Sequence, residues 1–175
     1  MVSESFVAAL NEQIAAEFSA SHQYVAIAAH YEARTLPRLA QFFYDQSLEE
    51  RGHAMMMVKY LLDTSSPVEL SEIGAPTTDF ADHVAPISLA LEQERGVTKR
   101  IGEIFKLARE EGDYLSEEFL RWFLKEQVEE EATMSQLLEV AERVRDLPDM
   151  LEEFIAREHP RSGAEDPMAP EAAGG

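Results

Sequence analysis

Four long stretches of the chain repeat apolar residues at intervals of three and four positions. This spacing places side chains on one face of a helix. We expect helices over residues 4–33, 37–63, 86–111 and 114–144, with a short amphipathic helix at about 147–158. Prolines, glycines and polar residues separate these stretches, as is typical of helix ends. The pattern therefore predicts an all-α fold.

The segments between the helices predict how the helices are connected. Thr35 is expected to cap the second helix ahead of Pro37, and Gly112 followed by Asp113 predicts a tight turn into the fourth helix. Short turns of this kind join antiparallel neighbours. Residues 64–82 have no helical period, and a connection of that length extends to about 60 Å. Because the helices are about 40 Å long, this connection can cross the whole bundle.

The expected architecture is a four-helix up-down bundle with one long crossover between its second and third helices, which makes those two helices parallel. The short fifth helix completes a single domain of residues 1–159. Residues 160–175 are rich in proline, glycine and alanine and have no helical period, so we expect a disordered C-terminal tail.

Composition narrows the classes of partner. The 175 residues are 45% hydrophobic, which is typical of a globular protein, and carry a formal net charge of −19. That negative charge argues against nucleic acid as a partner and favours cations as ligands. Solubility is the alternative explanation of the charge. The absence of cysteine excludes disulfides and thiolate metal sites. We see no signal peptide and no membrane-spanning stretch, so we expect a cytoplasmic protein with no membrane partner.

Polar residues interrupt the apolar face of each long helix near its middle. Helix midpoints share one level in such a bundle, so these side chains should meet in one layer. The interruptions, in chain order, are Glu17, Glu50 with His53, Glu94, and Gln127 with Glu130. Several ionised carboxylates in a dry core are unfavourable by several kcal/mol unless something compensates them. Two divalent cations would do so, and oxygen ligands with one imidazole favour iron or manganese over zinc.

Taken one at a time, these residues have simpler explanations. His53 alone would be a hydrogen-bonded core histidine, and Tyr24 alone a core aromatic with its hydroxyl bonded. Gln127 alone would form an interhelical hydrogen bond. The meeting of all of them at one level is what favours a metal pair.

Three segments together resemble the non-haem bacterial ferritins: residues 49–54, 91–95 and 122–131. The resemblance extends to about residue 158, with the helices, the crossover and the fifth helix in the same order. It implies a ferritin-like fold and a homo-oligomeric cage of 24 subunits. Such a cage oxidises Fe(II) with dioxygen and stores the ferric product as a mineral.

The resemblance also implies a di-iron centre inside each subunit. By position, the first iron would be bound by Glu17, Glu50 and His53. Glu50 would bridge to a second iron, which Glu94 and Glu130 would also hold.

Further residues around this centre follow from the same resemblance. Gln127 would lie beside the second iron near the oxygen-binding face, and Tyr24 would serve as hydrogen-bond donor and one-electron donor. A third iron site would lie nearer the cavity, and a solvated acidic face is the alternative explanation of its residues. These residues are Glu49, Glu126 and Glu129, with Glu130 shared.

The chain departs from the haem-binding bacterioferritins at two places. Those proteins carry a methionine directly after the bridging glutamate, where this chain has Arg51. They also carry a second Glu-x-x-His on the fourth helix, where this chain has residues 127–130, Gln-Val-Glu-Glu. We therefore expect no haem, and we interpret Met55, Met56 and Met57 as packing residues.

Other readings remain open from the sequence. A DNA-protecting mini-ferritin builds its site between subunits and lacks the fifth helix, whereas a rubrerythrin-like peroxidase has two Glu-x-x-His motifs. A helical bundle without chemistry would leave the polar layer unexplained. The apolar face of the fifth helix either lines a four-fold axis, as in the family, or packs on its own bundle. Asp113, Glu117 and Glu118 either line iron channels or stabilise a helix dipole.

Overall fold

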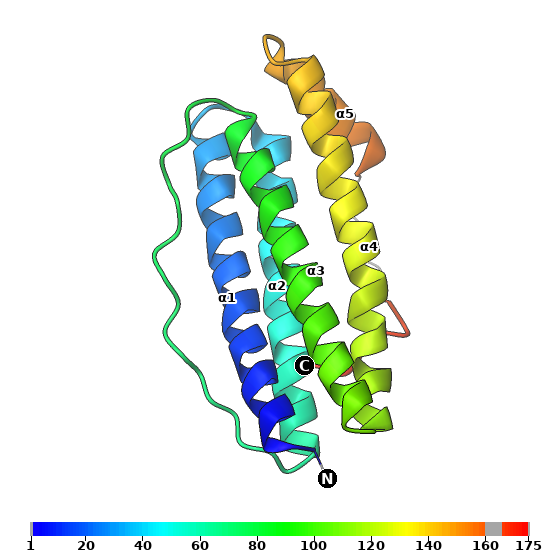
Figure 1. The fold of residues 1–175 in the computed structure, drawn as a ribbon. Coiled ribbons are helices and arrows are strands. Elements are labelled where there is room, and N and C mark those ends of the chain that lie inside the picture. Colours follow the sequence, from blue (N-terminus) through cyan, green and yellow to red (C-terminus); the bar gives the residue numbers. More distant parts are fainter. Residues whose placement is uncertain (1, 160–165, 175) are drawn as a thin grey trace.

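The computed structural model describes residues 2–159 and 166–174, and in them the chain forms five α-helices (Figure 1). The helices are α1 (Glu4–Glu32), α2 (Pro37–Asp63), α3 (Ala85–Glu110), α4 (Tyr114–Arg143) and α5 (Pro148–Glu158). The crossover runs the length of the bundle beside α1, so α2 and α3 point the same way (Figure 1). The predicted all-α bundle with one long crossover is confirmed.

The turn between α3 and α4 has the predicted form. Gly112 takes a φ of +70°, the left-handed conformation that ends many helices and that suits glycine. Asp113 then caps α4, because its side chain accepts a hydrogen bond from the backbone N–H of Ser116 at 3.1 Å. The two residues together reverse the chain within one turn.

The turn between α1 and α2 differs from the prediction. Thr35 lies outside the helix at a φ of +61° and does not cap it; the cap position belongs to Leu36, whose side chain cannot accept a hydrogen bond. Glu152 of α5 supplies the cap instead. Its carboxylate accepts hydrogen bonds from the backbone N–H groups of Arg38 and Leu39, at 2.9 and 2.7 Å. The helix start is therefore satisfied from a distant part of the chain.

Two amide side chains of α1 hold the crossover against the bundle. Asn11 donates to the carbonyl of Pro67 at 3.1 Å and accepts from the N–H of Glu69 at 2.8 Å. Gln23 pairs in the same manner with the carbonyl and N–H of Thr77, at 2.7 Å each. Each amide thus satisfies a donor and an acceptor of a backbone segment that forms no regular structure.

The hydrophobic core consists of two clusters, one in each half of the bundle. One cluster joins α5 to the nearer ends of the four long helices and includes Tyr31, Phe43, Ile87 and Leu137. The other occupies the opposite half and includes Phe6, Met57, Ile101 and Phe123. On each long helix, the predicted polar positions fall between the residues of the two clusters.

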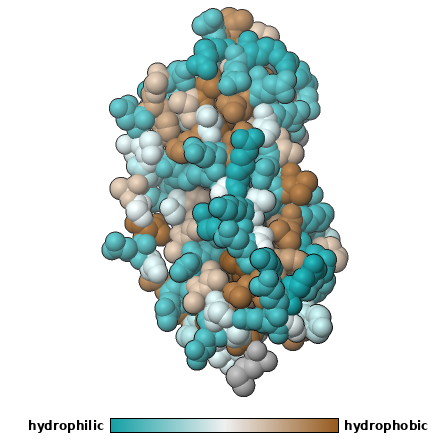
Figure 2. Space-filling model, in the orientation of Figure 1, coloured by the Kyte–Doolittle hydropathy of each residue, from teal (hydrophilic) through white to brown (hydrophobic). Residues whose placement is uncertain are grey.

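Helix α5 packs on its own subunit through part of its apolar face. Leu151, Phe154 and Ile155 are buried, whereas Leu147 and Met150 are 57% and 50% exposed. The exposed pair leaves an apolar edge at this end of the bundle. Elsewhere, the face in Figure 2 shows mostly hydrophilic side chains with apolar ones interspersed, in keeping with the net charge of −19.

The described part of the tail, residues 166–174, lies against α2 and α4. Trp122 donates its indole N–H to Asp166 at 3.0 Å, and the N–H of Ala173 donates to the carbonyl of Met55 at 3.1 Å. Disorder was predicted for the whole tail, residues 160–175, and residues 160–165 and 175 of it lie outside the described residues. Among the described helices, none combines the length and apolarity needed to cross a membrane.

Gly112, in the turn after α3, and Gly102, inside α3, give a matched test of that turn. Gly112→Ala is expected to lower the free energy of unfolding by about 1–2 kcal/mol, because a Cβ is strained at positive φ. Gly102→Ala lies inside α3, where an added Cβ meets nothing within 4 Å. It is expected to raise the same quantity by up to about 1 kcal/mol. Denaturant unfolding of both variants measures the difference, and equal effects would contradict the strained turn.

Candidate metal centre

The four long helices bring six polar side chains to one buried layer. Ordinary apolar residues one turn away on each helix hold these side chains in place, since they belong to the two core clusters above and below. The layer consists of Glu17, Glu50, His53, Glu94, Gln127 and Glu130, each no more than 6% exposed. The six side chains therefore lie in one layer near the middle of the long helices, as the positions of the helix midpoints predicted.

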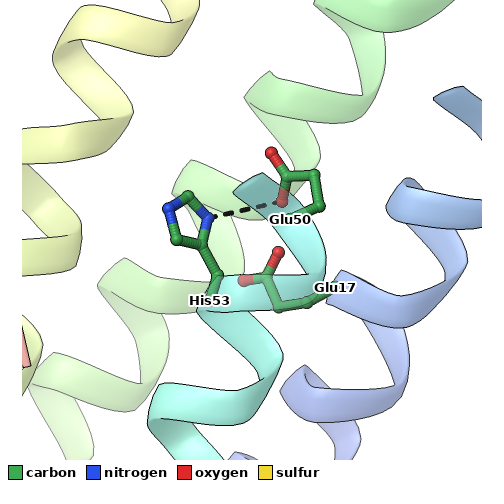
Figure 3. Close-up of side chains that lie close together, drawn as sticks. All are labelled: Glu17, Glu50 and His53. Atoms are coloured by element: carbon green, nitrogen blue, oxygen red, sulfur yellow. Dashed lines mark ion pairs between the residues drawn. The ribbon is translucent and has the colours of Figure 1, made fainter. Parts of the chain in front are cut away.

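Glu17 of α1 and Glu50 and His53 of α2 form a group whose ligand atoms lie within 4.8 Å of one another. In Figure 3 the two carboxylates and the imidazole face one another, and the Nδ1 atom of His53 lies 3.5 Å from Glu50 Oε2. One oxygen of Glu17 and both oxygens of Glu50 are buried without a hydrogen-bond partner among the described residues. Buried unpaired carboxylate oxygens beside an imidazole form a donor set that suits a divalent cation.

Glu94 of α3 lies on the other side of this layer with two hydrogen-bond donors. The hydroxyl of Tyr24 donates to Glu94 Oε1, and Gln127 Nε2 donates to Glu94 Oε2 at 3.1 Å. Gln127 Nε2 also lies 3.3 Å from the hydroxyl of Thr98. The structure therefore brings the side chains of Tyr24, Glu94 and Gln127 into contact.

A second acidic group leads from this layer to the surface. Ligand atoms of Glu49, Glu126 and Glu130 lie within 4.8 Å of one another, and the three residues grade from exposed through half-buried to buried. Glu129 stands apart from the group: its side chain is 63% exposed and lies 3.8 Å from Lys125 Nζ. Three of the four carboxylates expected at a third site are thus adjacent in the structure.

The carboxyl groups of the layer resist ionising together. Burial raises the pKa of Glu17, Glu50 and Glu130 well above the ordinary value, and neighbouring carboxylates raise it further. The strongest neighbours are Glu50 for Glu17, Glu94 for Glu50, and Glu49 for Glu130. Burial also raises the pKa of the Tyr24 hydroxyl, which therefore keeps its proton at neutral pH. Cations in the layer would reverse this penalty on the ionised carboxylates.

Aromatic rings border the layer at His53 and Tyr24. The rings of Trp122 and Phe123 stand edge-on to His53, with centroids 5.6 and 5.8 Å away. Phe43 lies 5.6 Å from Tyr24 on the other side. Such a shell keeps the local dielectric low and strengthens the interaction of the acids with any bound cation.

Sequence reasoning missed Gln13, which is 1% exposed and donates to Glu17 Oε1 at 2.7 Å. Its position one helical turn before Glu17 was the available signal. An amide at that spacing is common on helices and carries no metal-site meaning by itself. Trp122 was quoted only as part of a motif, and its contact with His53 depends on the packing of α4 against α2.

Comparison with known proteins identifies the family. The family model described as "Ferritin-like domain" matches residues 7–144, which include the four long helices, except the first three residues of α1, and every residue of the layer. The chain belongs to the ferritin family. Ferritins are iron-storage proteins, so the polar layer of this ferritin is a candidate iron site.

Individual relatives agree with this assignment. Over 170 residues, the chain is 49% identical to Ferritin BfrB of Mycolicibacterium smegmatis, covering 97% of this chain and 93% of the relative. It is 38% identical over 146 residues to a bacterial non-heme ferritin of Staphylococcus epidermidis, covering 83% of this chain and 88% of the relative. A 46% identical relative from Mycobacterium tuberculosis is named Bacterioferritin BfrB.

Solved structures agree at the level of the fold. An open-pore ferritin from the archaeon Archaeoglobus fulgidus superimposes with a TM-score of 0.88 at 30% sequence identity. The superposition covers 93% of this chain and all of that chain. The fold of this ferritin is therefore shared over nearly its whole length.

The raised pKa values predict a pH dependence for the metal-free protein. Folded Glu17, Glu50 and Glu130 keep their protons above the ordinary carboxyl pKa of 4.5, at which the unfolded chain releases them. The folded state therefore binds more protons, and its free energy of unfolding falls as the pH rises from 4.5 through the raised values.

The Glu50→Gln variant removes one of these buried charges. Metal-free Glu50→Gln protein is expected to be more stable than the parent at neutral pH and to lose less stability as the pH rises. Denaturant unfolding at a series of pH values measures both effects. Glu118→Gln is the control, because Glu118 is 75% exposed. A parental pH slope in Glu50→Gln would contradict the assignment.

Proposed function

We propose that this ferritin is a ferroxidase, which oxidises Fe(II) with dioxygen inside each subunit and stores the ferric product as a mineral. One observation carries the proposal. Carboxylates from all four long helices meet in one buried layer, and three of their oxygens, one of Glu17 and two of Glu50, have no hydrogen-bond partner among the described residues. A layer of this kind is unfavourable in a bundle without cations and well suited to bind two of them.

The proposed division of ligands follows the two halves of the layer. Glu17, Glu50 and His53 take the first Fe(II), and Glu94 and Glu130 take the second with Glu50 between them. Support comes from the close group around His53 and from the burial of all five side chains. Carboxylate ligands favour Fe(III) over Fe(II), so this donor set promotes oxidation, and two adjacent Fe(II) ions supply two electrons to dioxygen together.

Tyr24 and Gln127 act beside the second ion. Both donate hydrogen bonds to Glu94, so they hold its carboxylate ready and release it when a cation takes their place. Tyr24 keeps its proton because burial raises its pKa, and it can supply a proton and an electron from within the layer. The neutral amide of Gln127 is a weak ligand, which lets oxidised iron leave.

The proposed third iron site lies on the route out of the layer. Glu130, Glu126 and Glu49 grade from buried to exposed, which provides successive carboxylates for a departing cation. Glu129 stands apart from these three and marks the outer edge of the proposed site, and its charge helps to raise the pKa of Glu126. Burial raises the pKa of Glu49 and Glu126 as well, so protons released by ferric hydrolysis find acceptors there.

A homo-oligomeric cage of 24 subunits is the proposed assembly, and the proposed location is cytoplasmic. The family membership and an apolar groove of about 330 Å³ on the outside of α1 support the assembly. The groove includes Phe18, Val25, Leu70 and Ile73. Val25, Leu70 and Ile73 are at least 40% exposed in the isolated subunit, and a second copy of the chain would cover them.

Removing either central ligand tests the ferroxidase. Glu50→Ala and His53→Ala are each expected to slow aerobic Fe(II) oxidation by at least about tenfold, because each removes a ligand from the first ion. Stopped-flow absorbance of ferric species measures the rate, and gel filtration checks that the cage still assembles. Glu92→Ala is the control, since Glu92 lies exposed on the same helix as Glu94. Parental rates in both ligand variants would overturn the site.

We also propose that this ferritin binds no haem. Arg51 follows the proposed bridging glutamate where bacterioferritins have methionine, although one relative carries the bacterioferritin name. Incubation with haem followed by gel filtration is expected to leave the protein fraction without a Soret band. An Arg51→Met variant gives the matched comparison. Stoichiometric haem retained by the parent protein would contradict the proposal.

A further inference from the structure

A line of hydrogen bonds connects the surface of α3 to the buried carboxylate of Glu17. Arg100 Nε donates to Gln13 Oε1 at 3.1 Å, and Gln13 Nε2 donates to Glu17 Oε1 at 2.7 Å. Gln13 is 1% exposed, whereas Arg100 lies at the surface. Neither residue belongs to the proposed iron ligands.

The chemistry of the two end groups fixes the orientation of the Gln13 amide. A guanidinium can only donate hydrogen bonds, and the Glu17 carboxylate is ionised when it binds a cation and can then only accept them. Only one arrangement of the amide satisfies both, with its oxygen toward Arg100 and its nitrogen toward Glu17. The opposite arrangement would place two donors together at one end and two acceptors together at the other.

The same contacts decide which carboxylate oxygen of Glu17 is available to bind a cation. Gln13 occupies Oε1, while Oε2 is buried without a hydrogen-bond partner among the described residues. The carboxylate faces Glu50 and His53, the other members of the close group (Figure 3). One oxygen is therefore held by the protein, and the other is presented to a cation.

The Arg100 side chain lies along the surface of α3, over Gly96. The guanidinium lies back along the helix, and its Nη1 atom is 3.6 Å from the place that a Cβ of Gly96 would occupy. Helical side chains commonly lean toward the preceding turn in this manner. Arg100 is exposed and yet directed at one buried amide, which a surface charge kept only for solubility would not require.

We infer that Gln13 and Arg100 are positioning residues for the first iron site, and that they make Glu17 a single-oxygen ligand. This inference rests on the proposed function of the layer. Gln13 holds the carboxylate in place before the cation arrives, and Arg100 holds Gln13. Outer contacts of this kind fix a ligand without touching the metal.

Anaerobic titration of the metal-free protein with Co(II), followed by its visible absorption bands, tests the inference without any turnover. Gln13→Met keeps the side-chain volume and removes the amide. It is expected to weaken the first Co(II) affinity by about tenfold and to alter the bands of that site. Arg100→Ala is expected to weaken the same affinity by a smaller factor.

Lys99→Ala is the matched control for Arg100→Ala, because it removes the same charge from the adjacent position of α3. The Nζ atom of Lys99 lies 4.0 Å from Glu103 Oε1, and Lys99 takes no part in the line of hydrogen bonds to Glu17. Parental Co(II) affinity in Lys99→Ala supports the inference. A loss equal to that of Arg100→Ala would overturn it, since general charge would then explain both.

The double variant tests whether Arg100 acts through Gln13. In a Gln13→Met background, Arg100→Ala is expected to cause no further loss of affinity, whereas independent effects would multiply and overturn the inference. Glu17→Ala separates the two proposals. If Glu17→Ala binds Co(II) like the parent, the proposed iron site is wrong and the inference falls with it. If only Gln13→Met and Arg100→Ala behave like the parent, the inference alone is overturned.

Discussion

The burial of several acids at one level inside a four-helix bundle is the constraint on which the rest of this structure depends. Each acid loses its hydration, and each lies beside another acid, so the folded metal-free subunit carries an unfavourable layer at its centre. The two hydrophobic clusters above and below must hold the bundle together around that layer. The hydrophobic packing and the proposed metal site are therefore located in different parts of the same core.

This division explains several contacts that have no catalytic role. Asn11 and Gln23 bind the crossover backbone, and the rings of Phe43 and Phe123 belong to the clusters while also bordering the layer. Such contacts keep the four helices in register, which fixes the height of every polar side chain. A shift of one helix by a single turn, about 5.4 Å, would separate its carboxylate from the others.

The sequence alone was sufficient for the helices, the crossover and the level of the layer, because a three-four spacing of apolar residues determines which face of each helix is buried. The spacing placed Glu17, Glu50 and His53 in that layer, whereas their grouping as ligands of one ion was implied only by the resemblance to the bacterial ferritins. Periodicity could not find contacts between residues that lie off these faces. Arg100 reaches Gln13 only because α3 packs beside α1, and Glu129 lies apart because its helical position faces Lys125 and the solvent. Thr35 failed as a cap for a related reason, because the packing of α5 decides which group meets the start of α2.

The cap that Glu152 provides for α2 has a consequence for synthesis on the ribosome. Glu152 follows Arg38 by 114 residues, so the nascent chain has already produced all four long helices before this carboxylate exists. Until then the first turn of α2 has exposed N–H groups with no partner from the chain, and it is free to fray. Helix α5, translated after the four long helices, thus completes the start of α2, and a chain released before α5 would lack that closing contact even with every proposed iron ligand in place.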